Sequence, residues 1–194
     1  RVHPDDLARV REATAHNLAT GINENTEYRV LRPDGSIRHV STSSSMLYDE
    51  AGKLRRAVGT VLDITEARES ARALKRTADL LAEAQRIGKM GSFEVSMIDD
   101  AHTWSDELYR IADIDPWLPP SVDMFMQRLH EEDRGRIGAL IQRSYRDGIT
   151  EPSRARLVRR DGSISHLDMM AVPQFDPEGR LVALRGTVSD VTEL

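Results

Sequence analysis

Cysteine is absent from this 194-residue chain. Without cysteine the protein can form no disulfide framework and no thiolate metal site, and it has no cysteine nucleophile. These exclusions remove several common classes of small stabilised domain and of catalytic or metal-binding protein before any pattern is considered.

Long apolar runs and a strong charge of one sign are also missing. No stretch approaches the ~20 apolar residues that a membrane-spanning helix requires, and no signal peptide is visible. The formal net charge is −5, with 30% charged and 39% hydrophobic residues. This composition lacks the basic footprint of a nucleic-acid-binding protein. We therefore expect no nucleic-acid partner and no membrane span in this segment.

Aromatic residues are scarce and unevenly placed. Phe, Trp and Tyr together make up only 5% of the chain, and Tyr28 and Tyr48 alone fall within the first 90 residues. A first segment of ~65 residues with so few large side chains makes a marginal core. Its open sheet edge would seek another strand, from upstream residues or from a neighbouring chain. The remaining aromatics are Phe93, Trp104, Tyr109, Trp117, Phe125, Tyr145 and Phe175.

The strongest positive feature is an internal repeat. Residues 1–67 align with residues 128–194 without a gap, and 23 of the 67 positions are identical. Gly35 corresponds to Gly162 and Gly59 to Gly186, so the separation between the copies is constant. Both copies keep an Asp-Gly-Ser-Ile segment and a Gly-Thr-Val-x-Asp-x-Thr-Glu ending. The chain therefore contains two copies of one structural unit.

Each copy has the pattern of three antiparallel strands. Gly35 and Gly162 follow aspartate in hairpin dipeptides, because glycine adopts positive φ without a Cβ clash. A longer turn with a late glycine comes after each second stretch. The segments between the turns are rich in Val, Ile, Leu, Thr and Ser, which is typical of strands.

A helix is expected ahead of each set of strands. Apolar residues follow helical spacing after His3 and after His130. We interpret these two histidines as local capping groups. Gly21 and Gly148 stand where a left-handed C-terminal cap belongs.

A helix opened by His-x-x-Asp, an Asp-Gly hairpin and an Asp-x-Thr ending occur in this order, twice. Together they resemble PAS domains, in the subgroup common in bacterial sensor proteins. The resemblance implies an α+β fold in which a five-stranded antiparallel sheet carries helices on one face. It divides the chain into the C-terminal half of a PAS domain (1–65), a linker or signalling helix (66–90) and a complete PAS domain (91–194). We expect an excised piece of a longer protein whose output domain is missing.

The resemblance also bears on cofactors, although it leaves their identity unknown. Light-sensing PAS relatives form a cysteinyl–flavin adduct, which a chain without cysteine cannot form. Haem-binding relatives carry an axial histidine in the region of His16, but the second copy has Arg143 at the equivalent position. We therefore expect no flavin adduct and no haem.

The linker has the spacing of a coiled-coil seam, with small or apolar residues at alternating intervals of four and three. Two interpretations remain open: an amphipathic helix that lies on its own domain, or a signalling helix that forms a homodimer. Alanine dominates the seam, so any pairing would be weak. The seam positions are Ala67, Ala71, Leu74, Ala78, Leu81, Gln85 and Gly88.

Nothing in the sequence supports a catalytic site. No phosphate-binding glycine loop, nucleophile elbow or paired-carboxylate arrangement is present. His166 and Asp168 alternate on one predicted strand, but two ligands without a third are weak evidence for a metal. We interpret them as a polar strand face and predict no metal site.

Two groups of residues are candidates for function. The first would line a cavity between sheet and helices, which either binds a small ligand or is filled by Leu, Met and Phe side chains. A cavity of ~300 Å³ or more with convergent polar groups would favour a ligand. The predicted lining is Phe93, Leu108, Ile111, Phe125, Leu129, Ile137, Leu140, Ile141, Leu167, Met169, Leu184 and Val188. The second group is a junction formed by Asp63, Thr65, Asp190 and Thr192, which would cap backbone N–H groups and relay strain from the sheet.

By resemblance, the chain is a sensory or relay input module of a bacterial signalling protein and is not itself an enzyme. The expected parent is a sensor histidine kinase, with a small ligand or dimerisation as the input. The alternative is a ligand-free structural relay in a diguanylate cyclase or phosphodiesterase-type protein. The resemblance also implies a cytoplasmic module, in a parent protein that can be membrane-anchored.

Overall fold

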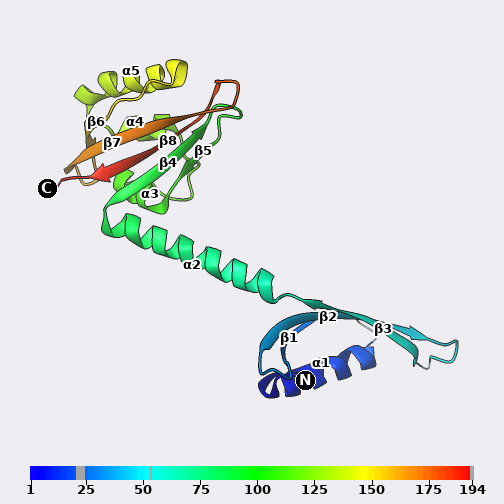
Figure 1. The fold of residues 1–194 in the computed structure, drawn as a ribbon. Coiled ribbons are helices and arrows are strands. Elements are labelled where there is room, and N and C mark those ends of the chain that lie inside the picture. The colour runs from blue at the N-terminus through cyan, green and yellow to red at the C-terminus, as the bar shows by residue number, and fades with distance from the viewer. Residues whose placement is uncertain (21–24, 53, 193–194) are drawn as a thin grey trace. The chain divides into compact units, whose positions relative to one another are not determined.

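The computed structural model describes residues 1–20, 25–52 and 54–192. The chain divides into two compact units, Arg1–Thr77 and Ala78–Leu194, and each is described by itself (Figure 1). The predicted cap at Gly21 and the last residue of the second repeat motif, Glu193, lie outside the described residues. No helix in the described ranges has both the length and the apolar character that a membrane crossing demands.

The first unit is a helix followed by a three-stranded antiparallel meander. Among its described residues only Val40 is a buried hydrophobic side chain, and every residue of the third strand is exposed. The core is therefore as marginal as the short length and few aromatics predict. Its elements are η1 (Pro4–Asp6), α1 (Leu7–Thr20), β1 (Thr26–Leu31), β2 (Ile37–Tyr48) and β3 (Leu54–Asp63), with the strand order β1-β2-β3.

A single long helix, α2 (Thr65–Ile87), runs across the boundary between the two units in the chain. It begins with Thr65 and carries Glu66 in its first turn, where a negative charge suits the helix dipole. It ends before Lys89, whose positive φ of 46° turns the chain out of the helix and into the next strand. This helix covers most of the range 66–90 that was expected to form a linker or signalling helix, and that role stays a prediction.

The second unit has the predicted α+β architecture: a five-stranded antiparallel sheet in the order β5-β4-β8-β7-β6, with helices on one face (Figure 1). The strands are β4 (Met90–Ser96), β5 (His102–Trp104), β6 (Ser153–Val158), β7 (Ile164–Phe175) and β8 (Leu181–Asp190). The helices are α3 (Asp106–Ala112), α4 (Val122–Arg128) and α5 (Glu131–Asp147).

The core of the second unit joins the helices to the sheet. One buried cluster packs Leu108 and Ile111 of α3 against Leu157, Leu167 and Val188 of the sheet. A second cluster joins Leu129 and Ile137 to Ala155, so that α5 and the segment before it lie on β6. Larger, partly buried side chains border the space between α5, α4 and the centre of the sheet, outside these two clusters.

Helix starts in the second unit are fixed by local capping. Ser105 and Ser121 accept hydrogen bonds from the N–H groups of Leu108 and Met124, each at 3.3 Å. His130 Nδ1 accepts from the Glu132 N–H at 3.4 Å, and His3 does the same in the first unit. The capping role predicted for the two histidines is confirmed. Gly148 has a φ of 64° at the end of α5, which confirms its predicted role.

The repeat extends to the pairing register of the strands. In the first unit Ser44 faces Gly59, and in the second unit Ala171 faces Gly186, which are the equivalent positions of the repeat. The register shifts at Leu47/Tyr48 in β2 and at Gln174/Phe175 in β7, which are equivalent as well. Even an isolated bridge recurs, between Val2 and Val30 and between Leu129 and Leu157. The two copies therefore share backbone geometry as well as sequence.

An Asp–Arg clamp fastens each main helix to the first strand that follows it. Arg156 donates from its backbone N–H and from Nε to Asp133 Oδ2, at 2.8 and 3.0 Å. These hydrogen bonds from Arg156 hold the pKa of Asp133 at about 2, below its ordinary value. Asp6 and Arg29 make the same contacts, at the same distances, in the first unit. The clamp fixes the start of the helix relative to the sheet.

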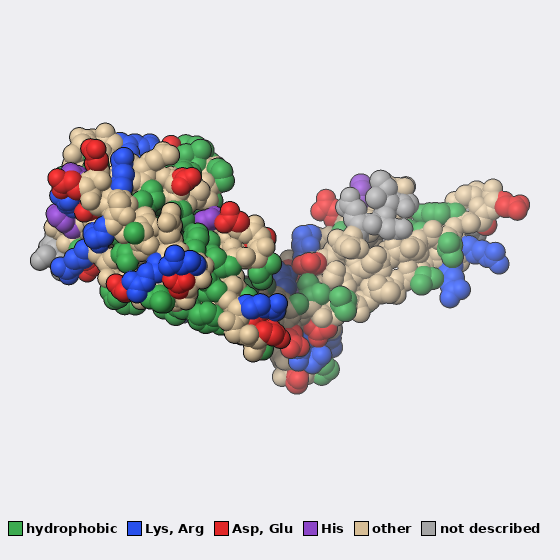
Figure 2. Space-filling model, turned by 90° about the horizontal axis from the view of Figure 1, so that it is seen from above, with side chains coloured by type: hydrophobic (Ala, Val, Ile, Leu, Met, Phe, Trp, Pro, Cys, Tyr) green, Lys and Arg blue, Asp and Glu red, His purple; other side chains and the backbone are tan. Residues whose placement is uncertain are grey.

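Charged side chains of both signs are interspersed over the face that Figure 2 shows, with hydrophobic side chains exposed among them. Several large hydrophobic side chains are at least 60% exposed, and four of them lie on α2. They are Leu74, Leu80, Leu81 and Ile87.

Candidate functional site

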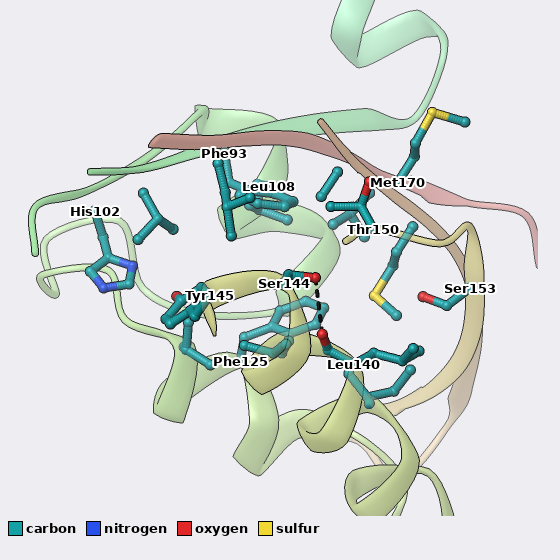
Figure 3. Close-up of a pocket in the computed structure, with 18 of the residues that line it drawn as sticks. Phe93, His102, Leu108, Phe125, Leu140, Ser144, Tyr145, Thr150, Ser153 and Met170 are labelled. Carbon is teal, nitrogen blue, oxygen red and sulfur yellow. Dashed lines mark hydrogen bonds between the residues drawn. The ribbon is translucent and has the colours of Figure 1, made fainter. Parts of the chain in front are cut away.

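The second unit contains a cavity of about 120 Å³ between the sheet and the helices (Figure 3). Its walls come from the strands β4, β5, β6, β7 and β8 on one side, and from α3, α4, α5 and the segment after α5 on the other. Most of the lining is apolar or aromatic. Trp104 lies at 5.2 Å from the Tyr109 ring and at 6.3 Å from the Phe125 ring, centroid to centroid, so aromatic packing shapes this wall.

Most of the lining predicted from the sequence borders this cavity. The residues concerned are Phe93, Leu108, Phe125, Ile137, Leu140, Ile141, Met169, Leu184 and Val188. Whether a ligand contacts them stays a prediction.

Three of the predicted lining residues lie elsewhere. Ile111, Leu129 and Leu167 are 3%, 0% and 0% exposed and belong to the packed core clusters. Ile111 packs in the cluster that joins α3 to the sheet. Leu129 pairs with Leu157 on β6, and Leu167 faces Asp190 at the far end of β8. The sequence therefore did not distinguish the residues of the packed core from those of the cavity wall.

The sequence did not indicate the polar part of the lining. These residues come from four separate segments, and no spacing pattern links them. They are His102 on β5, Ser144 and Tyr145 on α5, Thr150 and Glu151 in the following segment, and Ser153 on β6. The Ser144 hydroxyl donates to the carbonyl of Leu140 at 2.9 Å, and Glu151 forms an ion pair with Arg143 at 3.1 Å.

Two polar atoms at one end of the cavity have no hydrogen-bond partner among the described residues. They are Nδ1 of His102 and the hydroxyl of Tyr145, and both are buried. The other ring nitrogen of His102, Nε2, lies 3.6 Å from the carboxylate of Asp100. Burial raises the pKa of Tyr145, and the nearby negative charge of Asp100 raises it further. This end of the cavity therefore favours a neutral tyrosine.

The Asp-x-Thr junctions hold the same hydrogen bonds in both copies. The N–H and hydroxyl of Thr65 donate to Asp63 Oδ1 at 3.0 and 2.6 Å, and the His39 N–H donates to the Thr65 hydroxyl at 2.8 Å. Thr192 makes the matching bonds to Asp190 and to the N–H of His166. The bonds are those expected of a cap, and the relay role stays a prediction.

The second junction is more tightly held than the first. The Asp190 side chain is 11% exposed and accepts from Arg159 at 2.9 Å, whereas the Asp63 side chain is 44% exposed. Burial raises the pKa of Asp190, but the hydrogen bonds from Thr192 and Arg159 outweigh it and lower the pKa overall. The Asp190 N–H also donates to the carbonyl of Lys89 at 2.9 Å. The end of β8 is thus bound to the residue directly before β4.

The His166-x-Asp168 pair has the geometry of a polar strand face. Asp168 accepts from Arg154 Nε at 2.7 Å, and His166 is exposed. Within the described ranges no three His, Asp or Glu side chains converge in a way that could hold a metal ion. His16, the position considered for haem, is exposed on α1.

A family model described as "PAS fold" matches residues 1–61 and 101–188, which is more than half of the chain. The chain belongs to the PAS fold family. As a PAS module it is a sensory rather than a catalytic part of a signalling protein. The match covers parts of both copies of the repeat, so the first unit shares the PAS pattern with the second.

Curated relatives of this PAS chain are much longer proteins. It is 25% identical over 204 residues to "Uncharacterized protein y4lL" of Sinorhizobium fredii, covering 99% of this chain and 23% of that protein. It is 20% identical over 192 residues to "Probable diguanylate cyclase DgcE" of Escherichia coli, covering 98% of this chain and 17% of that protein. The chain thus spans less than a quarter of either relative.

Two solved structures are similar to part of this chain. The N-terminal domain of a diguanylate cyclase with PAS/PAC sensor from Marinobacter aquaeolei has a TM-score of 0.49 at 17% identity, covering 54% of this chain and 96% of that structure. A sensory box histidine kinase/response regulator from Burkholderia thailandensis has a TM-score of 0.46 at 18% identity, covering 58% of this chain and 85% of that structure.

Proposed function

We propose that the second PAS unit senses a small molecule in the cavity between its sheet and its helices. The observation that supports this is the cavity itself, an apolar space with two buried, unpaired polar atoms at one end among the described residues. Such atoms are costly unless something satisfies them. The volume of about 120 Å³ does not reach the ~300 Å³ set out above as favouring a ligand, so the proposal rests on the two polar atoms, and the ligand must be small.

The strand β8 offers a short route from this cavity to the junction. Leu184 and Val188 of β8 border the cavity, and Asp190 lies two residues further along the same strand. A ligand that shifts β8 acts directly on the hydrogen bonds of Asp190 to Thr192 and Lys89. We propose that this coupling passes the signal from the sheet to the residues that flank the unit.

We further propose that the module works as a homodimer through α2. The seam residues Ala71, Leu74, Ala78 and Leu81 are exposed on this helix, and Leu74 is 73% exposed. Pairing with a second copy would remove these side chains from water. Because burying one leucine contributes roughly 1.5–3 kcal/mol, the two leucines of the seam support only a weak dimer. A weak dimer suits a switch, since the free energies of both states must lie close together.

The parent protein is proposed as a sensor histidine kinase, with a diguanylate cyclase as the second candidate. The Escherichia coli relative, which matches 98% of this chain, favours the second candidate. Either activity would come from an output domain outside this chain. Measuring autophosphorylation and cyclic dinucleotide synthesis in the full-length protein distinguishes the two.

Native mass spectrometry of the purified chain tests the sensory proposal, because it reports bound ligand and dimer together. We expect an adduct that is lost when Ala171→Leu fills the cavity. Ser44→Leu, at the equivalent position of the first unit, is the matched control and should keep the adduct. If the wild type carries no adduct, and the fluorescence and melting temperature respond to no small molecule in a screen, the module is a structural relay instead.

A further inference from the structure

The unpaired atoms at one end of the cavity define what kind of group a ligand must present there. Tyr145 and His102 lie near each other at this end (Figure 3), and the Asp100 carboxylate lies 3.6 Å from His102 Nε2. Neither Nδ1 of His102 nor the Tyr145 hydroxyl has a partner among the described residues, so they do not bond to each other. A ligand atom between them can satisfy both.

The protonation of His102 determines the direction of its hydrogen bond. Nε2 of the ring lies 3.6 Å from the Asp100 carboxylate, which favours the tautomer that carries its proton on Nε2. Nδ1 then accepts a hydrogen bond from the cavity side. The Tyr145 hydroxyl can donate to the same ligand atom. A hydroxyl group both donates and accepts, so a single hydroxyl fits this pair of atoms.

Charge and size restrict the rest of the ligand. No lysine or arginine of the described chain borders the cavity, whereas Glu151 does, so an anionic ligand has no counter-charge there. The walls next to the polar end are formed by Phe93, Phe125 and other apolar side chains. A cavity of ~150 Å³ with apolar walls holds benzene, and the volume here is about 120 Å³. The remaining space therefore suits one small ring.

We infer that the cavity binds a small neutral hydroxyl-bearing ring compound of the phenol type. Its hydroxyl donates to His102 Nδ1 and accepts from Tyr145, and its ring lies among the aromatic and aliphatic side chains. This inference rests on the proposed sensory function, because it uses the same cavity, and it adds the chemical class of the ligand.

Phenol and toluene are the matched probes, because they differ only by a hydroxyl in place of a methyl group. Binding to the whole chain is measured by titration with NMR chemical shifts. We expect the wild type to bind phenol about tenfold more tightly than toluene, since two hydrogen bonds to buried groups are gained. In Tyr145→Phe the preference should fall to within about twofold. Tyr109→Phe is the control, because the Tyr109 hydroxyl donates to the Leu118 carbonyl outside the cavity.

Thermal unfolding provides a second readout. Tyr145→Phe removes a buried hydroxyl that has no described partner, so the melting temperature should rise or stay unchanged while phenol affinity falls. A clear fall in melting temperature would mean that the hydroxyl serves the fold, and the inference would be overturned. His102→Leu should reduce phenol preference in the same way.

Two further outcomes separate this inference from the proposed function. If toluene binds as tightly as phenol, the polar pair does not select the ligand and the inference fails, while a ligand-binding cavity remains. If neither probe binds but the purified chain carries another small molecule that Ala171→Leu removes, the chemical class is wrong and the sensory proposal stands. If neither probe binds and no small molecule is carried, both are refuted.

Discussion

Gly186 of β8 is a position where one added methyl group should clash severely with its neighbours. A Cβ atom there would lie 2.6 Å from Phe93 Cε1 and still closer to the carbonyl oxygen of Met170. The Phe93 ring lies over Gly186 across the β4–β8 pair and borders the cavity. Since the carbonyl belongs to the backbone of β7, it cannot move without disturbing the sheet. We expect Gly186→Ala to destabilise the second unit by about 3 kcal/mol, the upper end for overpacking.

The repeat supplies a control for this substitution. Gly59 occupies the equivalent position in β3, where an added Cβ would meet the Ser43 carbonyl oxygen at 3.0 Å and no aromatic ring. Both tryptophans of the chain, Trp104 and Trp117, lie in the second unit, so their fluorescence reports the unfolding of that unit alone. Urea titration with this signal should show a lower midpoint for Gly186→Ala and an unchanged midpoint for Gly59→Ala.

The reasoning would be refuted by equal urea midpoints for Gly186→Ala and the wild type. The reasoning would also fail if Gly59→Ala lowered the urea midpoint of the tryptophan signal by as much as Gly186→Ala does. In a domain of about this size each kcal/mol lowers the melting temperature by roughly 4–8 °C, so the expected effect is far above the error of the assay.

Four other variants test the two junctions, the helix α2 and the Asp–Arg clamp. Asp190→Ala should destabilise the second unit by about 0.5–2 kcal/mol, the range for a lost cap, which a thermal melt detects. Asp63→Ala should cost the first unit less, because that carboxylate is more exposed. Ala71→Leu with Ala78→Leu should tighten the dimer; identical monomers for wild type and double mutant in analytical ultracentrifugation would show that α2 is only a spacer. The pKa of Asp133 is about 2, below its ordinary value of 3.8. The stability that the charged Asp133 carboxylate gives to the folded unit is therefore complete above pH ~4 and is lost as the pH falls through the folded-state pKa. An acid titration followed by tryptophan fluorescence should show that Asp133→Asn loses less stability on acidification than the wild type does.

The elements that sequence reasoning predicted well are those with local or repeated signals. The hairpin at Gly162 and the cap at His130 depend on neighbouring residues, and the second copy repeats each pattern. The junction at Asp190 could be predicted for the same reason. Met169 and Val188 were both predicted to line the cavity, and the structure pairs them directly on neighbouring strands.

Features that depend on residues far apart in sequence could not be predicted in this way. The clamp between Asp133 and Arg156 joins distant positions of the chain, and no helix or strand periodicity indicates it. The repeat itself was the available signal, since Asp6 and Arg29 stand at the equivalent positions of the first copy. The polar end of the cavity was missed because His102 and Tyr145 lie on different elements, and only the folded chain brings them together.

The bond between Asp190 and Lys89 has a mechanical consequence. The chain enters the second unit's sheet at the start of β4 and leaves it at the end of β8, and these antiparallel strands are paired from Met90–Ser189 onward. Tension applied at the two ends would therefore open the ladder one hydrogen bond at a time, rather than shear all bonds at once. Such a joint yields to a smaller force than one loaded in shear, so we expect a pull from α2 to separate β4 from β8, and both strands border the cavity.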